Sequence, residues 1–248
     1  MQREELSRYL DGLLEVSRYR DYCPNGLQVE GRGEIRRIVS GVTASLDLLE
    51  AAHAKGADAV LVHHGYFWKG EDPCITGTRR ARIAMLIEHK LNLYAYHLPL
   101  DAHAEFGNNA QLGRRLGLVE TGRFADQEIG MCGTLEAPQR LDAFALQIGD
   151  RLGRVPLVIG DAAKQVRKIA WCTGGAQGLF EEAIKLNPDA YISGEISEQQ
   201  VHLARETGVA FIAAGHHATE KYGVQALGEH LAARLGLEHH YIEVSNPV

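Results

Sequence analysis

Imidazole and carboxylate side chains gather at two places in this sequence where apolar stretches end. The dipeptide His63-His64 follows residues 57–62, and Gly215-His216-His217 follows a comparable stretch, residues 209–214. Imidazoles placed beside carboxylates away from solvent are unfavourable unless a proton or a cation holds them together. The pairing of these two places therefore predicts a metal centre.

The spacing of nearby residues completes a predicted ligand set. His216 and Glu220 stand four residues apart at the start of a predicted helix, which places them on one face with Cβ atoms about 5–6 Å apart. Asp101 adds a second carboxylate from a predicted loop that begins at His97 and whose path Pro99 helps to fix. The predicted metal ligands are His63, His64, Asp101, His216 and Glu220.

Adjacent strand residues point to opposite faces, so His63 and His64 reach one site only if the strand has already ended, as Gly65 permits. Each of the two histidines then contacts one of two neighbouring ions. Three imidazoles and two carboxylates suit zinc, iron, manganese, cobalt or nickel better than calcium. Five ligands are too many for one open zinc site but sufficient for two ions about 3.5–4 Å apart. Glu220 is the predicted bridge, and Glu220 or His97 is the predicted catalytic proton relay.

Other histidines and turns carry weaker signals. We expect hydrogen-bonded or packed roles for five histidines, His53, His89, His230, His239 and His240. For His103 and His202 the sequence favours neither a packing role nor a ligand role. His97 and His217 stand beside proposed ligands. The glycine-containing turns at residues 41–45 and 172–178 match no nucleotide fingerprint and favour tight backbone geometry over phosphate binding. The run Tyr66-Phe67-Trp68-Lys69 is compatible with stacking on a planar ring beside an anion, or with packing alone.

Strands and helices alternate along the chain, which predicts an α/β fold with mainly parallel sheets. A first helix carries Leu6, Leu10, Leu13 and Leu14 at helical spacing, before the turn Pro24-Asn25-Gly26 and the short apolar run 27–29. We then expect strands near 35–42, 58–62, 92–96, 129–135, 155–159, 168–172, 189–193, 209–214 and 238–244. The helices between them are expected near 45–55, 78–90, 108–116, 140–152, 178–186, 197–207 and 218–235.

Two interlocked domains are expected. Residues 1–125 would carry His63, His64 and Asp101, and residues 126–248 would carry His216 and Glu220. Thr43 and Asp58-Ala recur as Thr173 and Asp189-Ala at nearly constant offset, which indicates a degenerate internal duplication. The alternative is that any two βαβαβ units look alike at this level.

Composition limits the functional classes. The 248 residues are 45% hydrophobic and 23% charged, as is ordinary for a globular protein, and the net charge of -6 disfavours binding to a nucleic-acid polymer. Four cysteines without CxxC spacing argue against a thiolate zinc site or a disulfide framework. The acidic N-terminal start is unlike a signal peptide, and no stretch approaches membrane-spanning length, so we expect a cytoplasmic protein.

Several motifs together resemble one protein family. They are Pro24 to Glu30, His63-His64-Gly65, His97 to Asp101, Gly107-Asn-Asn109 and Gly215 to Glu220. In order and spacing they are similar to the Nif-three-like family of dinuclear metal proteins, and within it to the bacterial YbgI-type group of GTP cyclohydrolase 1 type 2 homologues. The resemblance implies the same five metal ligands, two interlocked α/β domains, and a ring-shaped homohexamer whose metal sites face an internal cavity.

Three functional classes follow from these observations. The leading hypothesis is a dinuclear metal-dependent hydrolase acting on a small nucleotide or purine-like molecule, which for GTP would open the guanine imidazole ring and release formate. The second is a non-catalytic metal-binding or metal-delivery protein, for which similar ligands would serve. The third is a scaffold for partner proteins, which requires an exposed patch that the sequence does not locate.

Overall fold

The computed structural model describes all of residues 1–248 and divides into two compact units. Unit 1 comprises Met1–Phe106 and Gly223–Ser245, and unit 2 comprises Gly107–Tyr222 and Asn246–Val248. None of the helices is both long enough and apolar enough to cross a bilayer.

Unit 1 is built on a five-stranded sheet in the order β1-β4-β3-β2-β11. Only β1 runs antiparallel to its neighbour. Its strands are β1 (Gly26–Val29), β2 (Arg37–Thr43), β3 (Ala59–His64), β4 (Asn92–Ala95) and β11 (Glu238–Tyr241). Its helices are α1 (Arg3–Leu13), η1 (Val16–Arg18), α2 (Leu46–Ala54), α3 (Gly77–Glu88), α4 (Leu98–Ala102) and the part of α9 (His216–Leu235) that follows Tyr222.

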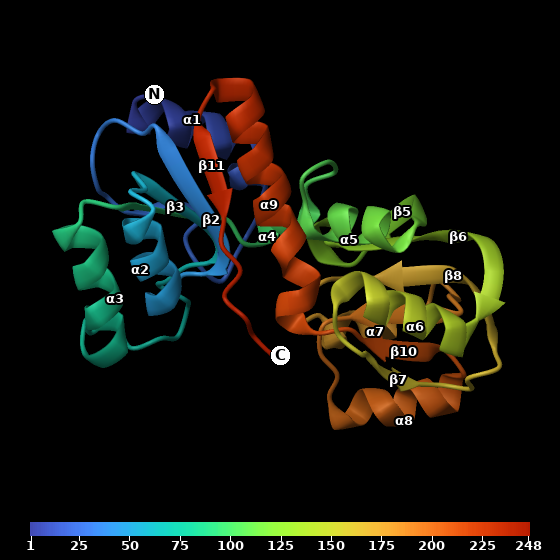
Figure 1. Cartoon of the computed structure of the whole chain (residues 1–248). Coiled ribbons are helices and arrows are strands. Elements are labelled where there is room, and N and C mark those ends of the chain that lie inside the picture. The colour runs from blue at the N-terminus through green and yellow to red at the C-terminus, as the bar shows by residue number, and fades with distance from the viewer. The chain divides into compact units, whose positions relative to one another are not determined.

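Two hydrophobic clusters cover the two faces of this sheet, because its central strands are apolar on both sides. On one face, Leu48 and Leu49 of α2 and Leu86 of α3 pack on alternate strand residues. On the other face, leucines of α1 and α9 pack on the residues between them. The helices thus sandwich the sheet (Figure 1), and the carboxyl ends of β2 and β3 emerge together at one edge.

Unit 2 is built on a six-stranded sheet in the order β5-β6-β8-β9-β10-β7. Its strands are β5 (Leu118–Phe124), β6 (Gly130–Arg140), β7 (Leu157–Ile159), β8 (Gln165–Trp171), β9 (Ala190–Ser193) and β10 (Ala210–Ala213). Its helices are α5 (Asn108–Leu116), η2 (Asp126–Glu128), α6 (Leu141–Leu152), η3 (Gln177–Leu179), α7 (Phe180–Ile184), α8 (Glu198–Thr207) and the start of α9.

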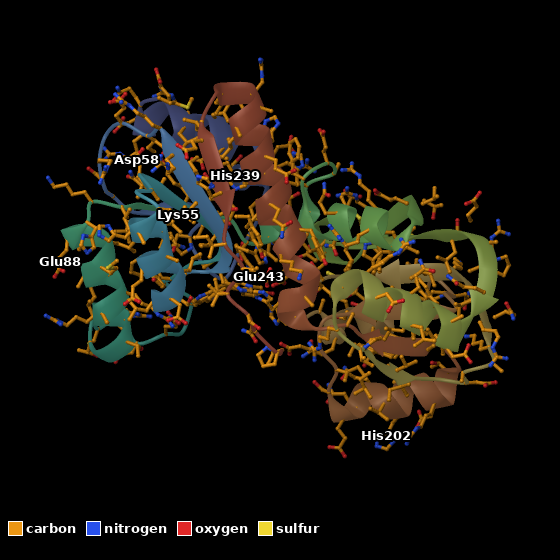
Figure 2. All side chains as sticks on the ribbon, in the orientation of Figure 1. Lys55, Asp58, Glu88, His202, His239 and Glu243 are labelled. Atoms are coloured by element: carbon orange, nitrogen blue, oxygen red, sulfur yellow. The ribbon has the colours of Figure 1, made fainter.

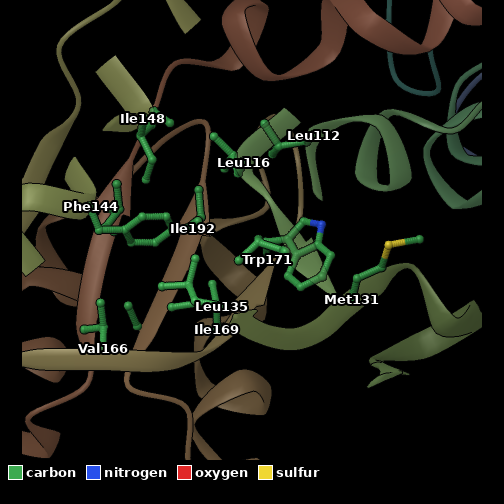
Figure 3. Close-up of a cluster of buried hydrophobic side chains, with 14 of the residues drawn as sticks. Leu112, Leu116, Met131, Leu135, Phe144, Ile148, Val166, Ile169, Trp171 and Ile192 are labelled. Carbon is green, nitrogen blue, oxygen red and sulfur yellow. The ribbon is translucent and has the colours of Figure 1, made fainter. Parts of the chain in front are cut away.

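The core of unit 2 likewise lies on both faces of its sheet. Figure 3 shows the larger cluster, in which Leu112 and Leu116 of α5 and Phe144 of α6 face Trp171 and neighbouring strand residues. The Trp171 indole donates to the Asn109 carbonyl (2.9 Å), which anchors the start of α5 to the end of β8. The opposite face carries a second cluster that includes the buried rings of Phe180, Tyr191 and Phe211.

One aspartate in each unit makes the same pair of backbone hydrogen bonds. The Asp58 carboxylate accepts from the backbone amides of Arg36 and Arg37 (2.8 and 2.9 Å) at the start of β2. The Asp189 carboxylate accepts from the amides of Arg167 and Lys168 (2.9 and 2.8 Å) at the start of β8. In both units the aspartate therefore holds the first residues of a strand, β2 or β8, that pairs in parallel with the next strand of its sheet, β3 or β9.

The expectation of mainly parallel sheets is confirmed for unit 1, where three of four strand pairs are parallel, and is wrong for unit 2. Both sheets are mixed, and in unit 2 three strand pairs are antiparallel: β5–β6, β6–β8 and β10–β7. Strand β5 was not predicted, because this edge strand is largely exposed and polar and lacks the apolar alternation that marks a strand. The expected boundary at residues 125 and 126 falls between β5 and β6, which pair with each other, and the structure divides the chain at Phe106 and Gly107 instead.

Candidate metal centre

Three histidines of unit 1 lie together at the carboxyl ends of β3 and β4. The ring centroid of His63 is 4.6 Å from that of His64 and 5.0 Å from that of His97. One ring nitrogen of each lies within 4.8 Å of the others, a spacing compatible with a shared ion. The strand β3 runs through both His63 and His64, because the ladder continues to the pair Thr43 and His64, so the strand ends two residues later than expected.

Each of these three histidines has its Nδ1 atom hydrogen-bonded to an oxygen. His63 donates to the carbonyl of Tyr96 (2.9 Å), since a carbonyl only accepts. His97 donates in the same way to the Asp21 carboxylate (2.8 Å), and the His64 Nδ1 atom is hydrogen-bonded to the Thr43 hydroxyl (3.1 Å). A proton on Nδ1 leaves Nε2 as the nitrogen with the lone pair, which is the atom that binds a metal.

Asp101 lies beside this cluster, but on a helix and not in the expected loop. It belongs to the short helix α4, whose N-cap is His97 and whose first turn holds Pro99, a residue suited to that position. The Oδ1 atom of Asp101 is 3.4 Å from the Nε2 atom of His63, and both side chains are buried. A lone pair that faces a carboxylate at this distance is stabilised by a cation between the two.

Sequence reasoning missed Asp21, which joins the loop before β1 to the start of α4. Its carboxylate accepts from the His97 ring, the Asn25 side chain and the Leu98 backbone amide. Burial alone would raise the pKa of Asp21, but these hydrogen bonds and the nearby imidazole outweigh it and lower the pKa to about 2. The only signal in the sequence was the turn at Pro24-Asn25-Gly26 that follows it.

Cys23 is a second residue at this cluster that was not predicted from the sequence. Its sulfur, a carboxylate oxygen of Asp21 and a ring nitrogen of His97 all lie within 4.8 Å of one another. Burial, together with the charges of Asp21 and Asp101, raises the pKa of the Cys23 thiol to about 12. Without an ion, the thiol is therefore protonated at neutral pH.

The two predicted ligands of unit 2 contact each other at the start of α9. The Nε2 atom of His216 lies 3.0 Å from the Oε2 atom of Glu220, one helical turn later, as the i,i+4 spacing predicts. The His216 Nδ1 atom lies 2.6 Å from the carboxylate of Glu195, which follows β9. Burial lowers the pKa of His216, but the two carboxylates outweigh it and raise the pKa to about 9.

The turn after β8 has a role other than phosphate binding. The amide of Gly174 donates to the Thr219 hydroxyl (3.0 Å), and the backbone of Gly174 has φ +68. A Cβ atom at this position would lie 1.8 Å from a carboxylate oxygen of Glu220. Glycine is therefore required here because the turn passes directly against the predicted bridging ligand.

The donors of unit 1 are compatible with a bound metal ion, and unit 2 contributes one imidazole and one carboxylate, from His216 and Glu220. His63, His64, His97 and His216 all have Nδ1 bound to an oxygen, the arrangement that holds the ring of a ligating histidine in place. Carboxylates lie beside Nε2 of His63 and of His216. Imidazole nitrogens and carboxylate oxygens are the donors expected for zinc, iron, manganese, cobalt and nickel.

Most of the remaining histidines have partners outside these donor groups. The five that we expected to be packed or hydrogen-bonded have such partners: His53 stacks on His89, and the other three bond to Tyr9, Ser40 and Glu238. His103 accepts from the backbone amides of residues 105 and 106, and His202 lies on the exposed side of α8. The backbone amide of His217 donates to the Val248 carbonyl.

The fold and the donor groups define a two-unit α/β protein with His, Asp and Glu clusters suited to a metal. The chain belongs to the Duf34/NIF3 (NGG1p interacting factor 3) family, whose profile matches residues 1–247. This confirms the family expected from the motifs.

The similarity to known members extends over the full chain. A Pseudomonas aeruginosa protein named GTP cyclohydrolase 1 type 2 homolog is 55% identical over 98% of this chain and 96% of its own length. The Escherichia coli protein of the same name is 48% identical over the whole of both chains. Among solved structures, that of the protein ybgI, described as of unknown function, superposes with a TM-score of 0.96 at 47% identity, and each chain is covered completely. The structure of TTHA1606 from Thermus thermophilus superposes with a TM-score of 0.91 at 36% identity, again over both whole chains.

Proposed function

We propose that His63, His64, Asp101, His216 and Glu220 jointly hold two divalent ions, and that the centre hydrolyses a small nucleotide or purine-like substrate. The observation that carries this proposal is the shared arrangement of the histidines, in which Nδ1 is bound to an oxygen, while Nε2 of His63 and of His216 faces a carboxylate. Structural histidines have no need of this uniform orientation, whereas ligating histidines do. Zinc, iron, manganese, cobalt and nickel all suit the set.

The ions would polarise the substrate and lower the pKa of a water molecule toward neutrality. The chain itself supplies the positions of the proton-accepting groups. Asp21 holds the proton of His97 on Nδ1, so that Nε2 of His97 can accept a proton beside the other imidazoles. Glu220 is the second group proposed to relay a proton, and its buried carboxylate is kept in place by its contact with His216.

The substrate class follows from the relatives. Those at about half identity are named GTP cyclohydrolase 1 type 2 homolog, which makes GTP the first substrate to test. For GTP, hydrolysis at the imidazole carbon of guanine would open that ring and release formate. No dinucleotide or phosphate-loop motif competes with this proposal.

The test is activity after defined metal loading. Metal-free protein is loaded in turn with zinc, manganese, iron, cobalt and nickel, and each form is offered GTP and a panel of nucleotides while formate and other products are measured. Turnover with at least one metal, lost in Glu220→Gln and in His64→Ala, is the expected result. Lack of turnover under every loading would contradict the hydrolase proposal.

A second function, delivery of metal to a partner, is favoured by the solvent exposure of two of the proposed ligands. The His216 side chain is 29% exposed, and His64 is also only partly buried. Ligands that remain open to solvent allow ions to exchange quickly, which suits a carrier more than an enzyme. Rapid transfer of bound metal to a chelator, together with the absence of turnover, would support this function.

The proposal also includes an internal duplication and a ring-shaped homohexamer. The duplication is supported by Asp58 and Asp189, which occupy equivalent positions in their units and make the same two hydrogen bonds.

The proposed hexamer has a mass that can be measured. Six copies of a 27.3 kDa chain have a mass of about 164 kDa. Light scattering coupled to size exclusion measures this mass directly, and a monomeric mass would contradict the hexamer.

A further inference from the structure

Exposed aromatic side chains are confined to one place in this protein. Tyr22 is 63% exposed and Phe67 is 40% exposed, and every other aromatic residue is at least partly buried. Both lie close in sequence to residues of the histidine cluster: Tyr22 follows Asp21, and Phe67 stands three residues after His64. Large aromatic rings left in water next to a cluster of polar donors are typical of a ligand site.

Trp68 joins these residues to the imidazoles. Its ring lies edge-on to His97, with centroids 4.9 Å apart and an interplanar angle of 83°, and its centroid is 6.0 Å from that of His64. Tyr22 also lies near His97, with ring centroids 6.4 Å apart. All of these residues belong to unit 1.

The hydrophobic core does not account for these rings. None of Tyr22, Phe67 and Trp68 is part of a hydrophobic cluster, whereas their neighbour Tyr66 is buried in one. The Tyr66 hydroxyl donates to the Ala44 carbonyl (2.7 Å), so this residue has a packing role. The aromatic run after His64 is thus divided between one core residue and two residues that stay outside the core.

The loop that carries Phe67 and Trp68 is held rigidly. The Gln28 side chain accepts from the Tyr66 amide (2.7 Å) and donates to the Tyr66 carbonyl (3.1 Å). The Lys69 amide donates to the Tyr22 carbonyl (2.6 Å), which ties this loop to the one that carries Tyr22. Phe67 has φ +65, a costly conformation for a bulky residue that persists only where surrounding contacts impose it.

We propose that Tyr22 and Trp68 bind the planar heteroaromatic ring of a ligand beside His97, and that Phe67 extends their apolar surface. Rigid aromatic side chains bind such rings by stacking at little entropic cost, because few of their rotatable bonds are left to order. The inference rests on the proposed function for the chemistry that follows binding, but the binding of the ring does not require turnover.

The test measures binding of guanosine, a purine nucleoside without phosphates, by isothermal titration calorimetry to metal-loaded protein. The parent should bind guanosine and not ribose. Because base stacking on an aromatic side chain contributes about 1–3 kcal/mol, Trp68→Leu and Tyr22→Leu should each weaken binding roughly 5- to 150-fold. Trp68→Phe keeps a ring and should lose less than Trp68→Leu.

Controls separate this effect from a loss of folding. Tyr22 is largely exposed, so Tyr22→Leu should leave the thermal midpoint unchanged. The matched control is Tyr9→Leu, which removes a tyrosine that stacks on His230 and should bind guanosine like the parent. A second measurement uses the Trp171→Phe variant. Trp68 is then the only tryptophan, and guanosine should quench its fluorescence.

Two results would overturn the inference: no binding of guanosine by the parent, or equal affinity in the parent, Trp68→Leu and Tyr22→Leu. These outcomes are distinguishable from failure of the hydrolase proposal. Guanosine binding without GTP turnover would leave the aromatic site standing while removing the enzyme. Turnover of GTP by Trp68→Leu with the parental KM would remove the aromatic site alone.

Discussion

The side chains around the candidate centre are ordered by their hydrogen-bond partners. A carbonyl or a carboxylate accepts from Nδ1 in His63, His97 and His216, and in His63 and His97 this sets which nitrogen of the ring carries the proton. The ring orientation is then fixed before any ion binds, which lowers the cost of assembling the centre. The partners of the histidines therefore matter as much as the proposed ligands.

Glu195 gives the first prediction at this scale. Glu195→Gln weakens the hydrogen bond to His216 Nδ1 without removing a proposed ligand, so metal affinity should fall about 10- to 100-fold. Competition with a fluorescent chelator measures the affinity. Glu198→Gln, at an exposed position of α8, is the matched control and should bind metal like the parent. Unchanged affinity in Glu195→Gln would show that this contact does not support the centre.

Asp21 gives the second prediction. In Asp21→Asn the amide can donate to His97, which would move the ring proton to Nε2 and remove the proposed proton acceptor. The kcat of the metal-loaded protein should fall about 10²-fold, a typical contribution of a general base, while the bound metal stays at two ions per chain. Metal analysis and steady-state kinetics together check this. Asp47→Asn, at an exposed residue of α2, should leave both unchanged.

At the scale of elements, α9 and β11 approach each other through a glycine. A Cβ atom on Gly228 of α9 would lie 2.1 Å from the ring of His239 in β11, whose position is labelled in Figure 2. The His239 ring is held by the Ser40 hydroxyl on β2 (2.8 Å). Helix α9 and strands β11 and β2 thus meet at the His239 ring, and there is no space for a side chain at position 228.

Gly228→Ala should therefore destabilise the protein, by about 1–3 kcal/mol as overpacking usually does. The urea midpoint of unfolding measures the change. The matched control is Gly12→Ala in α1, where a Cβ atom would meet nothing within 4 Å and alanine favours the helix. Gly12→Ala should hold or slightly raise the midpoint, and an equal loss in the two variants would contradict this account of the packing.

The ring of His239 also predicts that the stability of the protein depends on pH. Burial, with a smaller effect of His240, lowers the pKa of His239 to about 4 from its usual value near 6.5. The unfolded chain then binds a proton at a higher pH than the folded chain, so stability should fall as the pH decreases from about 6.5 toward 4. Urea midpoints at pH 7 and pH 5 measure the loss, which should be smaller in His239→Asn. An equal loss in both proteins would count against a role for His239.

At the scale of the whole molecule, the proposed ligands come from both units. His63, His64 and Asp101 belong to unit 1, and His216 and Glu220 belong to unit 2. An ion that binds only the folded protein stabilises it by about 2.7 kcal/mol at a hundredfold excess over Kd. If ligands of both units share the ions, metal should stabilise both units together.

The prediction at this scale concerns the effect of metal on thermal stability in the parent and in one variant of each unit. In the parent, zinc or manganese should raise the thermal midpoint of one cooperative transition, and EDTA should reverse the rise. Asp101→Asn in unit 1 and Glu220→Gln in unit 2 should each reduce the rise and the bound metal below two ions per chain. Calorimetry and elemental analysis check both. Two separate transitions, only one of which responds to metal, would indicate that each unit binds its ion alone.

Much of the architecture could be predicted from local sequence patterns. The apolar stretch before His63 and the helical spacing of His216 and Glu220 are short-range properties, and they located these residues at a strand end and on one helical face. The edge strand β5 lacked such a pattern and was missed. Asp101 was assigned to a loop because a helix as short as α4 has too few residues to show a period.

The sequence alone determined the family, the alternation of strands and helices, and the residue types from which a metal centre would be built, because these depend on motifs and periodicity along the chain. Only the tertiary structure decided how the rings are oriented. The partners of His63, His64, His97 and His216 stand between 21 and 76 residues away along the chain. Contacts at such separations arise from the packing of whole elements, and no local pattern encodes them.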